Sequence, residues 1–136
     1  MMWPPDVSTV LRYLIVLVIG GHGVAYLMYA SQSVKVLEGW AGQALLLGSI
    51  FSGRRLEALA VTLWAVAGIG LLCTAVAFGL CYSGSDYWRP IAIAASLVSI
   101  ASFAAVWDGR AVGFAPEGGI GMIISAIILA GAVGLP

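Results

Sequence analysis

The sequence predicts an all-helical membrane protein: a polytopic bundle of four transmembrane helices, with one further interfacial or short helix between the first and second spans. Of its 136 residues, 62% are hydrophobic and only 9% are charged, whereas soluble domains carry about 25% charged residues. A helix needs about 20 apolar residues to cross a bilayer, so four spans with short connections would account for nearly the whole chain. We therefore expect a single transmembrane domain over residues 1–136.

The first span is predicted over residues 9–30, an apolar run that follows Asp6 and Ser8. Either of these side chains can accept hydrogen bonds from the first backbone N–H groups of a helix. The second span is predicted over residues 56–80, where Glu57 falls in the first turn. A negative side chain is favourable there because the amino end of a helix carries partial positive charge.

The third span is predicted over residues 87–107. Pro90 falls within its first four positions, where a missing N–H breaks no helical hydrogen bond. The fourth span is predicted over residues 116–135 and opens with Pro116 and Glu117, a favourable pair for a first helical turn. Each segment is close to the length of about 20 residues that a membrane crossing needs.

Residues 36–52 form the ambiguous segment of the chain. Their apolar positions repeat at helical spacing, but Glu38 and Gln43 interrupt them and the segment is short for a span. We favour a helix that lies at the membrane interface, or folds onto the bundle, over a fifth span.

The number of spans decides the expected orientation, because cytoplasmic loops are enriched in Lys and Arg. With four spans, most basic residues lie on one side, so both termini are expected outside the cytoplasm. The residues on that side are Lys35, Arg54, Arg55 and Arg110. With five spans, Arg54 and Arg55 would change sides and the N-terminus would be cytoplasmic.

Small residues recur at helical spacing in the predicted third and fourth spans. Lipid provides no hydrophobic drive between helices, so helices associate through close contact at small residues and through interhelical hydrogen bonds. We therefore expect these residues at helix–helix interfaces. They are Ala92, Ala95, Ser99 and Ser102 in the third span and Gly121 and Ser125 in the fourth.

His22 is the one histidine of the chain and lies near the middle of the first predicted span, where a polar ring is costly unless it finds a partner. Tyr26 and Tyr29 follow at spacings that place all three on one helix face. This face predicts a ligand-binding site of His22, Tyr26 and Tyr29 that could hydrogen-bond a quinone carbonyl. The alternative is a purely structural histidine, buried where neighbouring glycines admit another helix.

Other chemistry is disfavoured. His22 has no second histidine or methionine clearly paired with it, so haem ligation is not expected, and no Cys, His and acidic cluster has the spacing of metal ligands. Six basic residues balance six acidic ones without a basic run, which argues against nucleic-acid binding. No nucleophile motif or phosphate-binding glycine loop is present, so the isolated chain is not expected to be an enzyme.

Three stretches resemble the DoxX-like family of small four-helix prokaryotic membrane proteins: RY leading into IGGHGVAYLMY, then ALAVTLWAVAGIGLL, then YWRPIAIAASLVSIASFAAVWDG. In that family an HG pair sits in the first helix and a tryptophan precedes a serine-containing third helix. The resemblance implies a prokaryotic cytoplasmic membrane and a quinone-linked role, since named members are similar to a subunit of a thiosulfate:quinone oxidoreductase. It rests on His22, Gly23, Trp88, Ser99 and Trp107.

One position departs from the family pattern. Tyr26 stands where some relatives carry a second histidine, so the resemblance implies no metal site here.

These observations lead to three functional expectations. The first is an accessory or structural subunit that packs against other membrane subunits or against itself. The second is a quinone-linked membrane redox protein with a lipidic cofactor or ligand near His22. The third is a small oligomeric transporter or channel, which is disfavoured because the sequence offers no intramembrane ion pair and no broken central helix.

Overall fold

The computed structural model describes residues 5–32, 46–47, 49–51, 53–80, 86–107 and 118–134. Within these residues all regular secondary structure is helical. The helices are α1 (Pro5–Ser31), α3 (Arg54–Leu80), α4 (Trp88–Val106) and α5 (Gly119–Gly134). The prediction of an all-α fold is confirmed.

Three of the described helices are long and apolar enough to cross a membrane, by length and composition. They are Thr9–Ser31 within α1, then α3, then α4. The fourth described helix, α5, is apolar but has only 16 residues. The helical structure therefore agrees with the expected membrane location.

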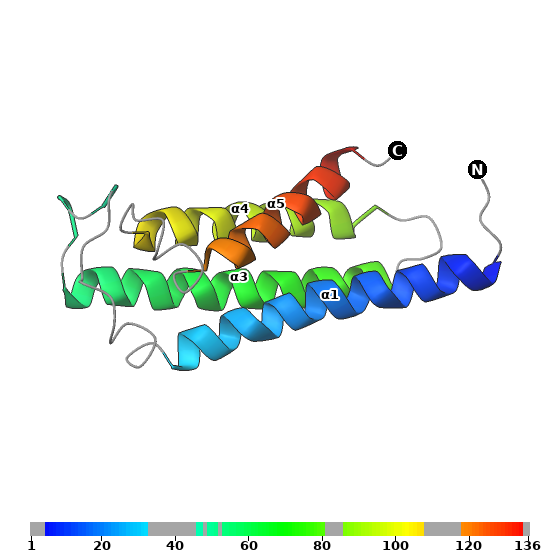
Figure 1. Cartoon of the computed structure of the whole chain (residues 1–136), viewed down its shortest axis with the longest axis horizontal. Helices are drawn as coiled ribbons and strands as arrows, with labels where there is room; N and C mark the ends of the chain where they lie inside the picture. The colour runs from blue at the N-terminus through cyan, green and yellow to red at the C-terminus, as the bar shows by residue number, and fades with distance from the viewer. Residues whose placement is uncertain are drawn as a thin grey trace.

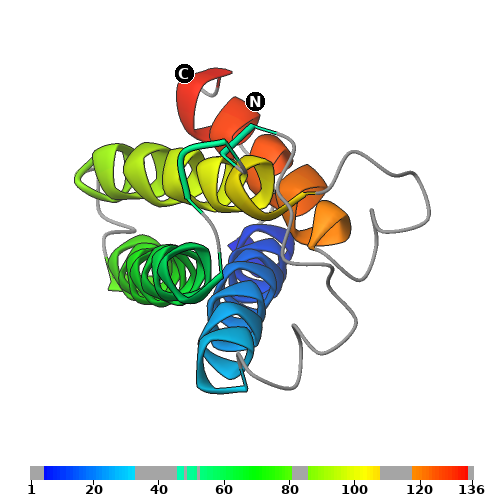
Figure 2. The ribbon, with the colours of Figure 1, turned by 90° about the vertical axis from the view of Figure 1, so that its left-hand side faces the viewer.

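The described helices form an antiparallel bundle in which each helix packs on the next one in the chain (Figures 1 and 2). Thus α1 lies on α3, α3 on α4 and α4 on α5, while α1 and α5 meet only over a short stretch. The start of α1, the end of α5 and the end of α3 lie at one end of the bundle (Figure 1). We call the line along which α1 faces α5 the α1/α5 seam.

Small residues set the closest helix contacts. A Cβ atom placed on Gly23 would lie 2.9 Å from the carbonyl oxygen of Gly68, and one placed on Gly68 would lie 2.9 Å from that of Gly23. The backbones of α1 and α3 therefore touch at this point. In the same way, a Cβ on Gly70 would lie 2.8 Å from the Cβ of Ala95, which brings α3 against α4. These two contacts position the helices around the site described below.

Glycines in the left-handed region precede two of the helices. Gly53 has a φ of 57°, and its carbonyl oxygen accepts hydrogen bonds from the amides of Leu56 and Glu57 at the start of α3. Gly118 has a φ of 99° and accepts a hydrogen bond from the Met122 amide at the start of α5. Side chains are disfavoured in this region of φ, so glycine suits both positions.

The helix ends differ from the predicted spans by a few residues. α1 begins at Pro5 and α3 at Arg54, and α4 lies within the predicted range. The predicted first turn of the fourth span, Pro116 and Glu117, lies outside the described residues. So does most of the predicted segment 36–52, of which residues 46, 47, 49 and 50 form turns.

Candidate polar site on the α1/α5 seam

His22 projects from the middle of α1 toward α5 and is only 8% exposed. Its Nε2 atom lies 3.0 Å from the Oγ of Ser125, a fully buried residue of α5. This hydrogen bond joins helices that otherwise meet little. The polar ring therefore has a partner inside the bundle, as a buried imidazole requires.

Tyr26 lies one turn further along α1 and completes a chain of hydrogen bonds. Its Oη lies 2.5 Å from the Oγ of Ser99 in α4, and this Oγ lies 2.5 Å from the Oγ of Ser125. The rings of His22 and Tyr26 meet edge to face, with their centres 5.0 Å apart. We call His22, Tyr26, Ser99 and Ser125 the polar cluster; it ties α1, α4 and α5 together.

A count of hydrogen atoms shows what the polar cluster can still bind. Its four side chains, with a neutral histidine, carry four polar hydrogens, and the three bonds between them use three. If His22 donates from Nε2, one hydroxyl hydrogen is left for a further acceptor. If Nε2 accepts, the remaining hydrogen is on Nδ1.

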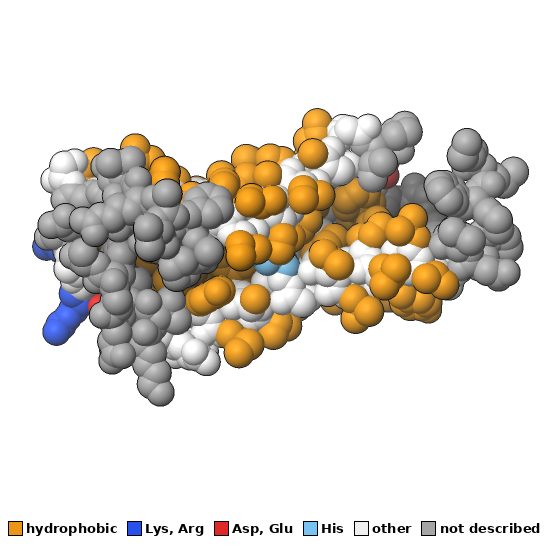
Figure 3. Space-filling view, in the orientation of Figure 1, with side chains coloured by type: hydrophobic (Ala, Val, Ile, Leu, Met, Phe, Trp, Pro, Cys, Tyr) orange, Lys and Arg blue, Asp and Glu red, His pale blue; other side chains and the backbone are white. Residues whose placement is uncertain are grey.

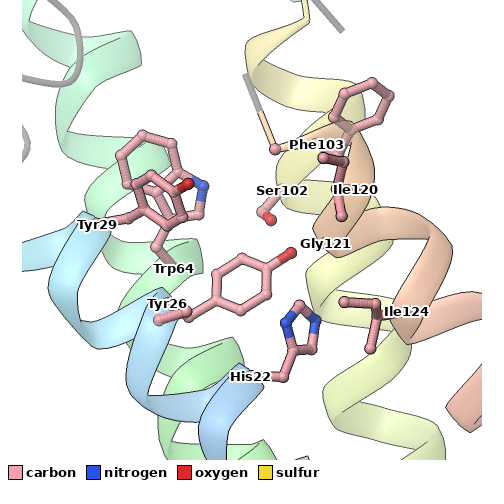
Figure 4. Close-up of a pocket in the computed structure, with 11 residues that line it drawn as sticks. His22, Tyr26, Tyr29, Trp64, Ser102, Phe103, Ile120, Gly121 and Ile124 are labelled. Atoms are coloured by element: carbon pink, nitrogen blue, oxygen red, sulfur yellow. The ribbon is translucent and has the colours of Figure 1, made fainter. Parts of the chain in front are cut away.

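A cavity of about 230 Å³ lies beside the polar cluster, between the described helices. Its polar wall consists of His22, Tyr26 and Ser102, and its aromatic wall includes Trp64 and Phe103. Figure 4 shows the Tyr26 hydroxyl pointing toward α4 and α5. None of the described residues that line the cavity is Lys, Arg, Asp or Glu. We call this space the first cavity.

The remaining walls of the first cavity are formed by Tyr29 and by α5. The ring of Tyr29 lies 6.0 Å from that of Trp64, centre to centre, and both stand on the side opposite Ile124 (Figure 4). A Cβ atom placed on Gly121 would lie 3.1 Å from His22 Cε1 and 3.3 Å from Tyr26 Oη. Gly121 therefore lets α5 approach the two rings closely.

The α1/α5 seam reaches the apolar surface of the bundle. In Figure 3 the ring of His22, shown in pale blue, is visible between hydrophobic side chains. The large side chains around it are exposed, among them Ile120 and Ile123 of α5 and Val18 of α1. Exposed aliphatic side chains of this kind suit contact with lipid tails rather than water.

The structure places every predicted site residue, though not always in the expected role. His22 and Tyr26 belong to the polar cluster, while Tyr29 lines the first cavity and has no part in the hydrogen-bond chain. Ala92 and Ala95 are both buried, and the Cβ of Ala95 faces Gly70 of α3. Ser99 and Ser125, expected as packing residues, are the central members of the polar cluster.

Ser102 and Gly121 also differ from a simple packing role. The Oγ of Ser102 donates a hydrogen bond to the carbonyl oxygen of Ser99, and both Ser102 and Gly121 line the first cavity. The sequence did not predict Trp64 and Phe103 as cavity walls. A signal was present for Trp64, because it lies in the middle of a predicted span rather than near an end, where anchoring aromatics are usual.

Two chemical possibilities can be assessed on the described residues. No group of three or more His, Cys, Asp or Glu among them could hold a metal ion. Cys73 is a free thiol on the exposed side of α3 and does not line the first cavity. The polar side chains that line the first cavity are hydrogen-bonding groups.

Comparisons with models of known protein families, with curated proteins and with solved structures found no match.

Proposed function

We propose that the protein is a four-span membrane protein that binds a neutral, lipid-soluble molecule in the first cavity, and that quinones are the favoured class. The observation that carries this proposal is the polar cluster itself. It places hydrogen-bonding groups at mid-helix, beside a cavity whose lining includes the exposed aliphatic side chain of Ile120.

The positions of the helices support four spans. The 16 residues of α5 extend about 24 Å, somewhat less than the roughly 30 Å of a hydrocarbon core. Ser125 of α5 is bonded to His22 of α1, so both helices occupy the same depth. An apolar helix that packs on α4 beside three candidate spans, with exposed aliphatic side chains, is best accommodated within the membrane.

The charges support an orientation. Arg54 and Arg55 open α3 at the end of the bundle opposite the start of α1 (Figures 1 and 3). The positive-inside rule then places that end in the cytoplasm and both termini outside it. In line with the DoxX-like resemblance, we assign the protein to a prokaryotic cytoplasmic membrane.

A ligand with a carbonyl group fits the first cavity. Small-molecule sites typically occupy about 300–1,000 Å³ and combine apolar walls with a few polar groups. The first cavity, at about 230 Å³, is somewhat smaller than this range, which suits a single ring system. A carbonyl oxygen would accept the hydrogen that the polar cluster retains when His22 donates from Nε2, and Trp64 offers a flat surface for the ring.

Binding of a quinone to the protein in lipid nanodiscs tests this proposal. We expect Tyr26→Phe to weaken binding by about the value of one neutral hydrogen bond, on the order of 1 kcal/mol, because the Tyr26 hydroxyl is the member of the hydrogen-bond chain that lines the cavity. We expect His22→Ala to weaken binding by up to the same amount, because it removes the imidazole that directs the chain of hydroxyl groups. This corresponds to a Kd raised about fivefold. Gly21→Ala is the matched control, because a Cβ at this neighbour of His22 meets nothing within 4 Å. Equal affinity of all four proteins, or no binding by any, would overturn the proposal.

A second candidate function is that of an accessory subunit, and one observation favours it. An open, almost entirely apolar groove of about 560 Å³ runs between α1 and α3, lined in part by Gly20, Gly21, Ala75 and Gly79. Small residues on an outer face let another membrane helix approach closely.

Purification from native membranes in mild detergent tests the accessory role. The accessory role predicts a stoichiometric partner, either another membrane subunit or a second copy of this chain. Gly21→Leu should abolish the binding of this partner. Gly134→Leu, on the open side of α5, should leave the partner in place. A protein that migrates alone in both cases would contradict this role.

A further inference from the structure

We propose that the ligand of the first cavity carries a single long apolar tail, and that this tail lies in a second cavity of the same seam. This inference rests on the proposed function and adds the class of ligand: a neutral ring with one tail. The second cavity has a volume of about 320 Å³. It is enclosed by α1 and α5 together with Phe78 at the end of α3 and Trp88 at the start of α4.

The two cavities follow one another along the seam. On α1 the first cavity is lined by residues between 22 and 29 and the second by residues between 14 and 19. The corresponding stretches are 118–124, at the start of α5, and 127–132 within it. Because α1 and α5 run in opposite directions (Figure 1), both helices place the second cavity on the same side of the first.

The hydrogen bond between His22 and Ser125 lies between the two cavities. Their centres are about nine residues apart on α1, which corresponds to roughly 14 Å along a helix. A chain attached to a ring in the first cavity can cover this distance along the outer side of the His22 ring, which Figure 3 shows at the surface of the seam.

The walls of the two cavities differ in the way that a ring and a tail require. The first offers imidazole and hydroxyl groups. The second is lined by aliphatic and aromatic side chains and glycine, with almost no polar surface. Neither set of described lining residues includes Lys, Arg, Asp or Glu. Among these described lining residues a phosphate headgroup finds no opposite charge, so they suit a neutral headgroup better than that of a phospholipid.

The outer edge of the second cavity is open to lipid. Leu14, Val18 and Ile127 line it and are also exposed, Ile127 at 67%. A tail longer than the cavity can therefore continue into the bilayer. One tail is expected because the seam between α1 and α5 offers one such track.

The position of the bound tail tests this inference more sharply than the affinity of the ligand does. Lipid is as apolar as the cavity, so a tail gains little hydrophobic free energy when it leaves one for the other. The experiment therefore uses two photoreactive benzoquinones with the same long alkyl tail, one with a diazirine on the ring and one with it in the middle of the tail. The full chain is labelled in phosphatidylcholine nanodiscs and the adducts are mapped by mass spectrometry.

We expect the ring probe to label residues of the first cavity and the tail probe to label residues 14–19, 127–132, Phe78 or Trp88. An excess of the unlabelled tailed quinone should remove both sets of adducts. If neither set is competed away, the proposed function fails together with this inference. If the ring adducts behave as expected but the tail adducts spread over the outer face of α3, at Val66, Ile69 and Val76, the proposed function stands and the tail inference is overturned.

A pair of variants provides an independent test. Ala132 lines the second cavity and is buried, whereas its neighbour Val133 is 67% exposed. Ala132→Phe should displace the tail adducts and leave the ring adducts in place, and Val133→Phe should change neither. Tail adducts that persist in a folded Ala132→Phe protein would overturn the inference. The wild-type mapping decides the question if that variant does not fold.

Discussion

α1 makes two kinds of contact on its two sides, and they differ in what they allow. Toward α3 it presents Gly23, whose backbone touches that of Gly68. Toward α5 it presents His22, which reaches Ser125 through a side-chain hydrogen bond. The first contact brings two backbones together at Gly23 and Gly68, and the apolar groove between α1 and α3 lies beside this point rather than within it. The second joins two helices at one point and leaves a cavity on either side of it.

The comparison indicates a division of roles within a very small bundle. Close backbone contact accumulates many weak van der Waals attractions, so the α1/α3 contact is suited to stability. A hydrogen bond is directional and individually modest, so the α1/α5 seam is suited to specificity and to the entry of a ligand. If this division is right, substitutions in the two places should affect different properties.

The largest effect is expected at the α1/α3 contact. In Gly68→Ala the new Cβ would lie 2.9 Å from the Gly23 carbonyl oxygen and from Leu27, so the helices must move apart. Overpacking of this kind costs about 1–3 kcal/mol. Reversible unfolding in SDS mixed micelles, followed by circular dichroism, measures the loss. Gly21→Ala, with open space around its Cβ, should leave stability unchanged or raise it; equal losses in both variants would contradict the steric explanation.

The next effect concerns the bond between His22 and Ser125. A double-mutant cycle of His22→Ala and Ser125→Ala should give a coupling energy of about 0.6 kcal/mol and at most about 1.7, the range found for hydrogen bonds between membrane helices. Thr74 provides the control, because its hydroxyl bonds the carbonyl of Gly70 within α3. His22→Ala and Thr74→Ala should be additive within about 0.5 kcal/mol. A coupling energy in the control cycle as large as that in the first cycle would show that His22 and Ser125 are not specifically coupled.

The contrast between the two sides of α1 also explains what could be predicted from sequence. The all-α fold follows from composition and from the length of the apolar runs, because a chain in lipid must satisfy its backbone hydrogen bonds internally. Placing Tyr26 on the same helix face as His22 requires only the spacing of four residues, which is about one turn of an α-helix. These are local properties of single helices.

The roles of Ser99 and Ser125 are not local properties. In a stripe of small residues a serine has the same pattern whether it serves only as a small side chain or also as a hydrogen-bond donor. Which role it takes depends on the rotation of α4 and α5 about their axes, and this is decided by contacts such as the one between Gly70 and Ala95. Trp64 was missed for the same reason, because only the assembled bundle brings it to the first cavity.

A smaller effect on stability, but a measurable one on binding, is expected at Gly121. A Cβ there lies 3.1 Å from His22 and 3.3 Å from Tyr26, distances that slight movements of the two rings relieve. Gly121→Ala should therefore lower quinone affinity while costing on the order of 1 kcal/mol of stability or less. Gly134→Ala, on the same helix with nothing within 4 Å, should change neither. Unchanged quinone affinity in Gly121→Ala would show that the ligand does not approach the rings of His22 and Tyr26.

The smallest effect is expected where a charged pair lies outside both helix contacts. Asp86 pairs with Arg89 at 3.1 Å at the start of α4, and Asp86 is 75% exposed. Exposed pairs contribute about 0.2–1 kcal/mol and are screened by salt, so Asp86→Asn should cost a few tenths of a kcal/mol and less at high salt. The same SDS unfolding assay at two ionic strengths measures this. If the free energy lost in Asp86→Asn equalled the coupling energy of His22 with Ser125, burial in the bundle would add nothing to a polar contact. A clearly larger coupling energy that does not depend on salt would show that the hydrogen bonds of the seam act away from water.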